Sequence, residues 1–239
     1  MTSLVDFRNR KGHVITQAFN RLNNEGIRYA LLMTLIALNY CVRLIKQKTF
    51  YFQNKELSYF YHPYNHSWVN ERTVEVPIVL EMIKDYQGKS MLEVGNVLRH
   101  YFAGMNHDVI DKGEKFPGVI NADVANFNSN KKYDFIVSIS TMEHVGFEED
   151  DKDVAKIPRA VQHLQKYLNP GGKIIITVPL QYNPHLDKYL SEGVFGRNVF
   201  FLKRTLFNSW REASYYEVKD LRYSKEITAN ALAVIVIQK

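Results

Sequence analysis

The stretch Ser90-Met91-Leu92-Glu93-Val94-Gly95, in the middle of the chain, decides the fold. Its apolar residues form a short run with a glycine, Gly88, just before it and another, Gly95, at its end, as in a buried strand between two turns. The acidic Glu93 stands near the end of that strand. Because Gly95 has no side chain, a ligand can approach the backbone closely there. We therefore expect a binding site at the carboxyl end of this strand.

Further strand and helix signals alternate on both sides of it, which is typical of an α/β sheet. Apolar residues spaced for one helical face predict helices over 76–86 and 154–168, and Asn169-Pro170-Gly171-Gly172 predicts a turn. Strands are predicted over 90–94, 108–111, 118–121, 133–139 and 173–178. At the end of the chain, 203–213 looks helical, and 215–221 and 231–237 look like two final strands.

Five short motifs along this pattern resemble one protein family. They are Leu92-Glu93-Val94-Gly95, Val109-Ile110-Asp111, Asn121-Ala122-Asp123, Tyr133-Asp134-Phe135-Ile136-Val137 and Leu168-Asn169-Pro170-Gly171-Gly172-Lys173. In this order they are similar to the class I S-adenosylmethionine-dependent methyltransferases, over about residues 76–239. The resemblance implies a Rossmann-like, mostly parallel seven-stranded sheet with an antiparallel C-terminal strand, and S-adenosylmethionine as cofactor. We expect an N-terminal helical extension over 1–50 and an aromatic cap or linker over 51–75 before this domain.

The resemblance also implies which residues hold the cofactor. In this family the acid at the Glu93 position lies near the methionine amino group, and the residue at the Asp123 position contacts the adenine amino group. An acid after the second strand, here Asp111, accepts hydrogen bonds from ribose hydroxyls. The expected cofactor-binding residues are Glu93, Gly95, Asn96, Asp111, Asp123, Val124 and Ser140. The alternatives are a solvated turn residue for Asp111 and an Asx turn for Asp123.

One departure from the family pattern lies in the loop after the first strand. The family usually has several glycines there, whereas the chain reads Gly95-Asn96-Val97-Leu98. Either the loop follows an altered path with an unusual backbone conformation at Asn96, which Asn tolerates well, or cofactor binding is weakened or lost. Because Asp111 and Asp123 are in place, we expect the cofactor to bind.

After the fourth predicted strand, Thr141-Met142-Glu143-His144-Val145 resembles the Leu-Glu-His turn of small-molecule methyltransferases. Histidine is the usual base near neutral pH, and an alcohol acceptor must lose a proton. We therefore expect His144 to be the general base for a hydroxyl acceptor. The alternative is a structural histidine hydrogen-bonded to the backbone.

The acceptor is expected to be a small molecule or a glycan. Rings and amides of the kind that recognise sugars follow the fifth strand and fill the segment 59–72, which could equally be a lid packed on the domain. The expected acceptor-binding residues are Glu143, Tyr182, Asn183, His185, Tyr64, Trp68 and Arg72. The spacing of His, Cys and acidic residues indicates no metal site.

The net charge of +6 lies in the first 50 residues, which hold eight basic and two acidic residues. A neutral catalytic body argues against nucleic acid as a partner, and hence against an RNA methyltransferase. The apolar stretch 29–42, flanked by Arg28 and Arg43, is shorter than the roughly 20 residues of a membrane span. The alternatives are a buried helix, a helix that binds a membrane surface or a partner, and a true transmembrane span. We expect a cytoplasmic protein, with peripheral membrane contact through residues 1–50. A catalytically silent scaffold that uses those helices is the alternative function.

Overall fold

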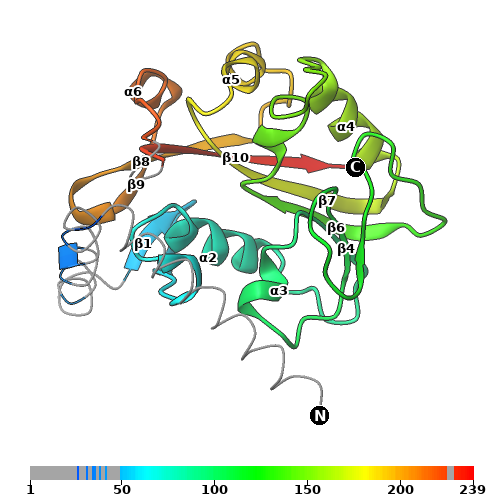
Figure 1. Ribbon diagram of the computed structural model, residues 1–239, viewed down its shortest axis with the longest axis horizontal. Helices are drawn as coiled ribbons and strands as arrows, with labels where there is room; N and C mark the ends of the chain where they lie inside the picture. Colours follow the sequence, from blue (N-terminus) through cyan, green and yellow to red (C-terminus); the bar gives the residue numbers. More distant parts are fainter. Residues whose placement is uncertain are drawn as a thin grey trace. The chain divides into compact units, whose positions relative to one another are not determined.

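The computed structural model describes residues 49–224 and 229–239, except the side chain of Phe207, and six isolated earlier positions (Figure 1). Those positions are Gly26, Leu31, Thr34, Leu35, Leu38 and Cys41. The chain divides into two compact units, 1–47 and 48–239. Apart from the positions named here, the predicted extension 1–50 and the apolar stretch 29–42 lie outside the described residues. In the described part of the chain, no helix is long and apolar enough to cross a bilayer.

The second unit is built on an eight-stranded sheet, within the described residues. Strands β3 to β7 run parallel to one another, whereas β10 is antiparallel to both of its neighbours and β9 is antiparallel to β8. From edge to edge the order is β5 (Val119–Ile120), β4 (Asp108–Ile110), β3 (Met91–Val94), β6 (Tyr133–Ile139), β7 (Leu168–Pro179), β10 (Ala231–Gln238), β8 (Val199–Arg204) and β9 (Trp210–Ala213). This confirms the predicted fold class, with β9 as one strand more than the seven expected.

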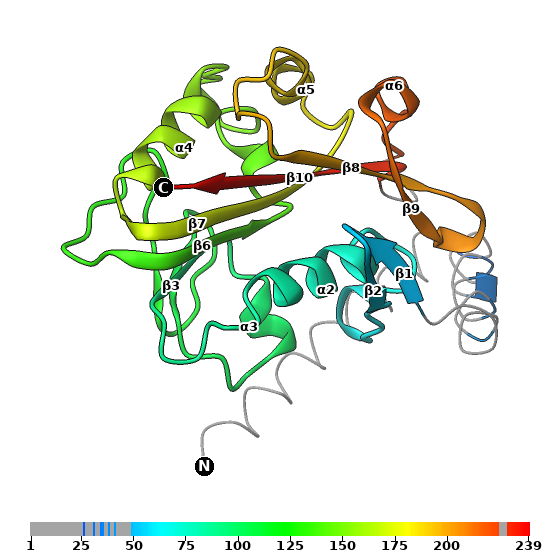
Figure 2. The same ribbon diagram turned by 180° about the vertical axis from the view of Figure 1, so that it is seen from behind.

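Helices cover both faces of the sheet (Figure 1; Figure 2 shows the same layers from behind). On one face lie α4 (Lys156–Gln165), α5 (Pro184–Ser191) and α6 (Tyr215–Val218), and on the other lie α2 (Arg72–Met82) and α3 (Leu98–Tyr101). Successive strand residues point to opposite faces, so Ile174 and Ile176 join one hydrophobic core and Ile175 joins the other.

A two-stranded hairpin, β1 (Thr49–Phe52) and β2 (Lys55–Ser58), packs on the far end of α2. Its rings, Phe50 and Phe52, share a third core with Trp210 of β9. Three short 3-10 turns complete the described structure: η1 (Tyr64–His66), η2 (Met142–His144) and η3 (Leu206–Asn208). The segment 51–75 is thus a hairpin, a turn and the start of α2.

Two predictions near the C-terminus were wrong. The segment 203–213, expected to be helical, contains the end of β8, η3 and β9, because pairing with β10 and burial of Trp210 override its helix-forming residues. The segment 215–221, expected to be a strand, begins with α6. Here Ser214 and Glu217 form a capping box, which starts a helix despite the β-forming tyrosines.

The predicted turn 169–172 was also wrong, because β7 begins at Leu168 and includes it. The pairing of β7 with β6 is irregular between Tyr133 and Phe135, and Gly171 has a positive φ of 76°. Gly172 has almost no room for a side chain, since a Cβ there would lie 3.0 Å from the carbonyl oxygens of Asn169 and Tyr133. The glycines therefore shape a bulged strand start.

Candidate active site

A cavity of about 750 Å³ opens at the carboxyl ends of β3, β4, β5 and β6. Ligands of open α/β sheets bind at this edge, and the volume lies within the usual range for small-molecule sites. The cavity is lined by Val94, Gly95, Ile110, Asp111, Lys112, Gly113, Ala122, Asp123, Val124, Thr141, His144, Val145, Glu148, Glu149 and Asp150. Of the residues predicted from sequence, Gly95, Asp111, Asp123, Val124 and His144 lie in this lining.

The loop after β3 is held from inside the protein by Glu93. Its carboxylate is fully buried, accepts hydrogen bonds from the backbone amides of Val97 (2.9 Å) and Leu98 (2.7 Å), and contacts His107 Nε2 at 2.7 Å. Glu93 is therefore not among the described residues that line the cavity. It acts on the cavity through the loop whose backbone it fixes.

Gly95 makes the turn into this loop, with a φ of 85° that favours glycine. A Cβ at this position would lie 2.2 Å from Thr141 Oγ1, so the loop and the end of β6 approach each other closely. Of the two alternatives for this loop, an unusual backbone at Asn96 is not found, because Gly95 and not Asn96 carries the positive φ. Asn96 is buried, and its amide donates to Glu114 Oε1 at 3.0 Å.

Asp111 lines the cavity directly after β4. Its Oδ1 accepts hydrogen bonds from the amides of Gly113 (2.8 Å) and Glu114 (2.7 Å), which fixes the turn. A carboxylate can accept about four hydrogen bonds. Asp111 therefore closes a turn, as in the alternative interpretation, and retains capacity for a ligand on the cavity side.

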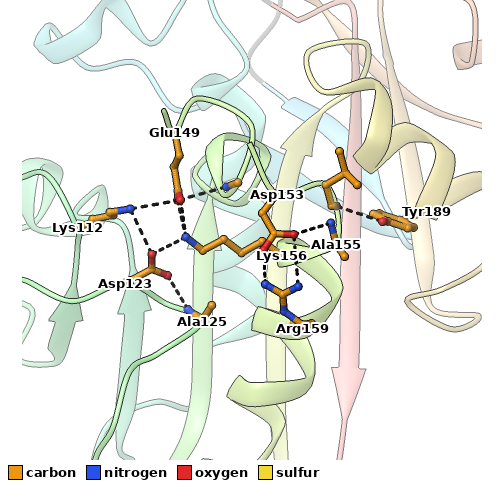
Figure 3. Close-up of polar contacts among 11 residues, drawn as sticks. Lys112, Asp123, Ala125, Glu149, Asp153, Ala155, Lys156, Arg159 and Tyr189 are labelled. Atoms are coloured by element: carbon orange, nitrogen blue, oxygen red, sulfur yellow. Dashed lines mark hydrogen bonds and ion pairs between the residues drawn. The ribbon is translucent and has the colours of Figure 1, made fainter. Parts of the chain in front are cut away.

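Asp123 belongs to a charged group on the far wall of the cavity (Figure 3). Its Oδ1 accepts from the Ala125 amide, and its Oδ2 contacts Lys156 Nζ at 2.5 Å and Lys112 Nζ at 3.3 Å. Lys156 also contacts both carboxylate oxygens of Glu149, at 2.7 and 2.6 Å. We call Lys112, Asp123, Glu149 and Lys156 the wall cluster. It joins the loop after β5 to the segment 146–155 that precedes α4.

The wall cluster shifts the pKa values of its members. Partial burial alone would raise the pKa values of Asp123 and Glu149, but hydrogen bonds, above all those from Lys156, lower both overall. Burial would lower the pKa of Lys156, and its two carboxylate partners raise it overall. All three groups are therefore charged at neutral pH. The ion pairs within the wall cluster balance its two carboxylates with two lysines without a ligand.

His144 stands in η2, just after β6, with an imidazole that contacts three other side chains. Its Nδ1 lies 2.8 Å from Glu148 Oε2 and 3.1 Å from the Tyr182 hydroxyl, which also donates to Glu148. Its Nε2 lies 3.7 Å from Glu143 Oε1. A carboxylate at Nδ1 favours a proton there, which leaves Nε2 free to accept one.

The other predicted acceptor residues are spread over several environments. Glu143 is buried, and Asn183 caps α5 and donates to the Glu143 carbonyl oxygen at 2.8 Å. Tyr182 contacts His144, whereas His185 is exposed in the first turn of α5.

Three further predicted residues belong to the segment 59–72. Arg72 pairs with the buried Glu75 of α2. The Tyr64 ring stacks on His100 with centroids 4.8 Å apart, and Trp68 meets the ring of His66 edge-on. The structure thus brings Tyr182, Glu143 and Asn183 close to His144, and places Tyr64 and Trp68 in ring contacts outside the cavity lining.

Ser140 was expected to bind the cofactor, but its hydroxyl donates to Glu75 Oε1 at 2.6 Å. It has a positive φ of 37° and is not among the described cavity-lining residues. The neighbouring Thr141 lines the cavity instead. Among the described residues, no group of three or more His, Cys, Asp or Glu side chains is arranged to hold a metal ion.

A family model described as a methyltransferase domain matches residues 67–229, about two thirds of the chain. The chain is a class I S-adenosylmethionine-dependent methyltransferase. Its strand order, with β10 inserted antiparallel between β7 and β8, agrees with this assignment. The enzyme uses S-adenosylmethionine as methyl donor.

Several solved structures resemble this methyltransferase at low identity. The N-methyltransferase NodS from Bradyrhizobium japonicum WM9, in complex with S-adenosyl-L-homocysteine, is 12% identical, with 67% of this chain and 84% of NodS covered and a TM-score of 0.40. TehB from Haemophilus influenzae is 14% identical, with 68% and 61% covered and a TM-score of 0.41. CalS10, an amino pentose methyltransferase from Micromonospora echinaspora, is 17% identical, with 49% and 56% covered and a TM-score of 0.34. A comparison with curated proteins gives no significant match.

The chemistry of the residues that line the cavity suits S-adenosylmethionine. The close approach at Gly95 leaves backbone exposed where a side chain would block it, and Asp111 offers a carboxylate to hydroxyl groups. The contributors missed from the sequence include Thr141 and Glu148 in the lining, and Lys112, Glu149 and Lys156 of the wall cluster. Glu148 lies four residues after His144, a spacing that could have suggested the pair. Nothing local marks Lys156, whose partners are 33 and 7 residues away.

Proposed function

We propose that the enzyme methylates a hydroxyl group of a small, sugar-type acceptor, with His144 as general base. The observation that carries this proposal is the contact of Glu148 with His144 Nδ1 at 2.8 Å, beside the cofactor cavity. It holds the imidazole with Nε2 as the free base. The Tyr182 hydroxyl contacts both residues and so helps to hold the two side chains in place.

The proposed cofactor site uses the cavity lining. The backbone at Gly95 would lie against the methionine part, Asp111 would accept from the ribose hydroxyls, and Asp123 and Val124 would border the adenine. When bound, S-adenosylmethionine supplies an electrophilic methyl group on a sulfonium. The role of the protein is then to hold the acceptor hydroxyl in line with that methyl and to take its proton on His144 Nε2.

Isothermal titration with S-adenosylhomocysteine tests the cofactor half of the proposal. We expect one binding site per chain, with affinity reduced in Asp111→Asn because the ribose loses a charged acceptor. Glu192→Gln, an exposed carboxylate on the end of α5, is the matched control and should bind as the unaltered enzyme does. Absence of binding to the unaltered enzyme would remove the proposed site.

Residues 1–50 carry the whole net charge of +6, which supports a second part of the proposal. We infer that this segment contacts an anionic membrane surface or a partner from the cytoplasmic side, while the catalytic domain acts on its acceptor. The balanced charge of the remaining chain supports an acceptor other than nucleic acid.

A further inference from the structure

A second group of charged side chains lies next to the cavity, where β6 and β7 end. Glu75 of α2 is fully buried there. Its Oε1 accepts hydrogen bonds from Ser140 (2.6 Å), which follows β6, and from Thr177 (2.7 Å), which lies near the end of β7. Glu75 Oε2 lies 2.5 Å from Arg72. These bonds fix the first turn of α2 beside the carboxyl ends of β6 and β7.

Three carboxyl groups in this place share a single guanidinium. Arg72 pairs with Glu75, and the buried Glu71 accepts a hydrogen bond from a backbone amide at 3.3 Å. Glu143, only 2% exposed, adds a third carboxyl from the turn after β6. Arg72 lies within electrostatic range of all three. One cation balances one carboxylate, so two carboxyl groups have no counterion in the described part of the chain.

Two polar atoms of this group have no hydrogen-bond partner among the described residues: Glu143 Oε2 and the hydroxyl oxygen of Tyr101. Tyr101 reaches the group from α3 and lies within electrostatic range of Arg72. Buried polar atoms without partners are rare because they lose their hydrogen bonds to water without replacement. Two of them around the same guanidinium, beside the general base, indicate a polar ligand group that completes both.

We propose that Glu71, Arg72, Glu75, Tyr101 and Glu143 form the acceptor subsite, and that it takes a hydroxyl compound carrying a protonated amine, which binds to Glu143. The assignment rests on the proposed function and names the acceptor class for it. The amine supplies the positive charge that the group lacks. Since His144 Nε2 is 3.7 Å from Glu143 Oε1, an amine on Glu143 places a neighbouring hydroxyl of the same molecule at the base. An acidic acceptor is excluded by the same carboxylates.

The titration of Glu143 agrees with this assignment. Burial first of all, and then Glu75 and Glu71, raise the pKa of Glu143 well above its usual range, against the opposing effect of Arg72. The other titratable groups that face it are His144, Tyr182 and Tyr223. The raised pKa favours the protonated form of Glu143 in the free enzyme. A bound ammonium favours the carboxylate, so the proton of Glu143 leaves to solvent on binding.

The test uses three small probes of similar size on the full chain loaded with S-adenosylhomocysteine: 2-aminoethanol, ethylene glycol and glycolate. Each keeps a hydroxyl and differs in the charge of its second group. In a titration followed by NMR, 2-aminoethanol should bind roughly tenfold tighter than ethylene glycol, the size of one charge-assisted hydrogen bond. Glycolate should bind most weakly. Glu143→Gln should remove the preference, and the exposed control Glu192→Gln should keep it.

Proton release on binding is a second measurement, and it would not change if Glu143 had only a structural role. Calorimetry of 2-aminoethanol binding in two buffers of different ionisation enthalpy should show a proton released by the unaltered enzyme and none by Glu143→Gln. If 2-aminoethanol binds the unaltered enzyme no better than ethylene glycol, the amine assignment is overturned, even if the variant does not fold. Loss of S-adenosylhomocysteine binding would instead contradict the proposed function.

Discussion

At the scale of single residues, the strictest requirement in the cofactor cavity is at Gly95. An alanine there combines a positive φ with a Cβ 2.2 Å from Thr141 Oγ1. We expect Gly95→Ala to cost about 1–3 kcal/mol of stability and to weaken binding of S-adenosylhomocysteine. Urea denaturation and calorimetry measure the two effects.

Gly104 provides the matched control for this substitution. It is exposed, a Cβ there would meet nothing within 4 Å, and its φ is not positive. Gly104→Ala should change stability by less than about 0.5 kcal/mol. A Gly95→Ala protein with unchanged cofactor affinity would show that the loop is free to move away from β6.

His144 and Glu148 make a second prediction at this scale. His144→Asn should lower turnover by about 10²–10⁴-fold while cofactor affinity is retained, because only the proton transfer is lost. Glu148→Gln should cause a smaller loss, together with a changed distribution of the imidazole proton between Nδ1 and Nε2, visible in ¹⁵N NMR of the ring. Asp151→Asn, exposed in the same loop, is the control. Unchanged turnover in His144→Asn would remove this residue from the mechanism.

Cavity-lining residues that directly follow a predicted strand could be found from the sequence. Gly95, Asp111, Asp123, Val124 and His144 follow recognisable strands, so the parallel topology alone brings them to one cavity. The direction of a side chain could not be predicted. Glu93 turns inward because the amides of its own loop and a distant histidine offer it three partners there.

At the scale of elements, α4 is joined to the cavity by Lys156, the buried member of the wall cluster in its first turn. Lys156→Met leaves Asp123 and Glu149 close together without that cation. We expect a loss of about 1–3 kcal/mol at pH 7 and weaker cofactor binding. Arg159→Met, in the same helix and paired with Asp153 in an exposed position, should have little effect.

The pH dependence of this difference follows from the lowered pKa values of Asp123 and Glu149. A carboxyl group whose pKa is lower in the folded state contributes stability above its unfolded pKa and loses it as the pH falls. The stability gap between the enzyme and Lys156→Met should therefore be full at pH 7 and narrow below about pH 4. A gap that stays constant with pH would mean that Lys156 acts by packing alone.

Helices and strands could be predicted where the pattern of apolar residues within the element itself is strong, as for α4 and the parallel strands. The C-terminal region could not, because its structure is decided by distant partners. Trp210 is buried against β1 and α2, and β8 exists by pairing with β10. The capping box at Ser214 and Glu217 was present in the sequence and would have indicated α6.

At the scale of the whole molecule, the prediction concerns the two compact units, 1–47 and 48–239. The cavity lies wholly within the second unit, so a chain that starts at residue 48 should bind S-adenosylhomocysteine as the full chain does. In flotation with vesicles rich in anionic lipid, the full chain should rise with the vesicles at low salt and the shortened chain should not. Equal flotation of both would locate the membrane contact elsewhere.

The buried Glu93 has a consequence for how enzymes of this kind are found. The Glu93 carboxylate accepts hydrogen bonds from two backbone amides of the loop after β3 and so fixes the conformation of that loop. In the family pattern, several glycines occupy this loop instead. Patterns that demand three glycines after the first strand will pass over such proteins. In this chain the loop is shaped instead by Glu93, by the single glycine two places after it, and by His107 just before β4.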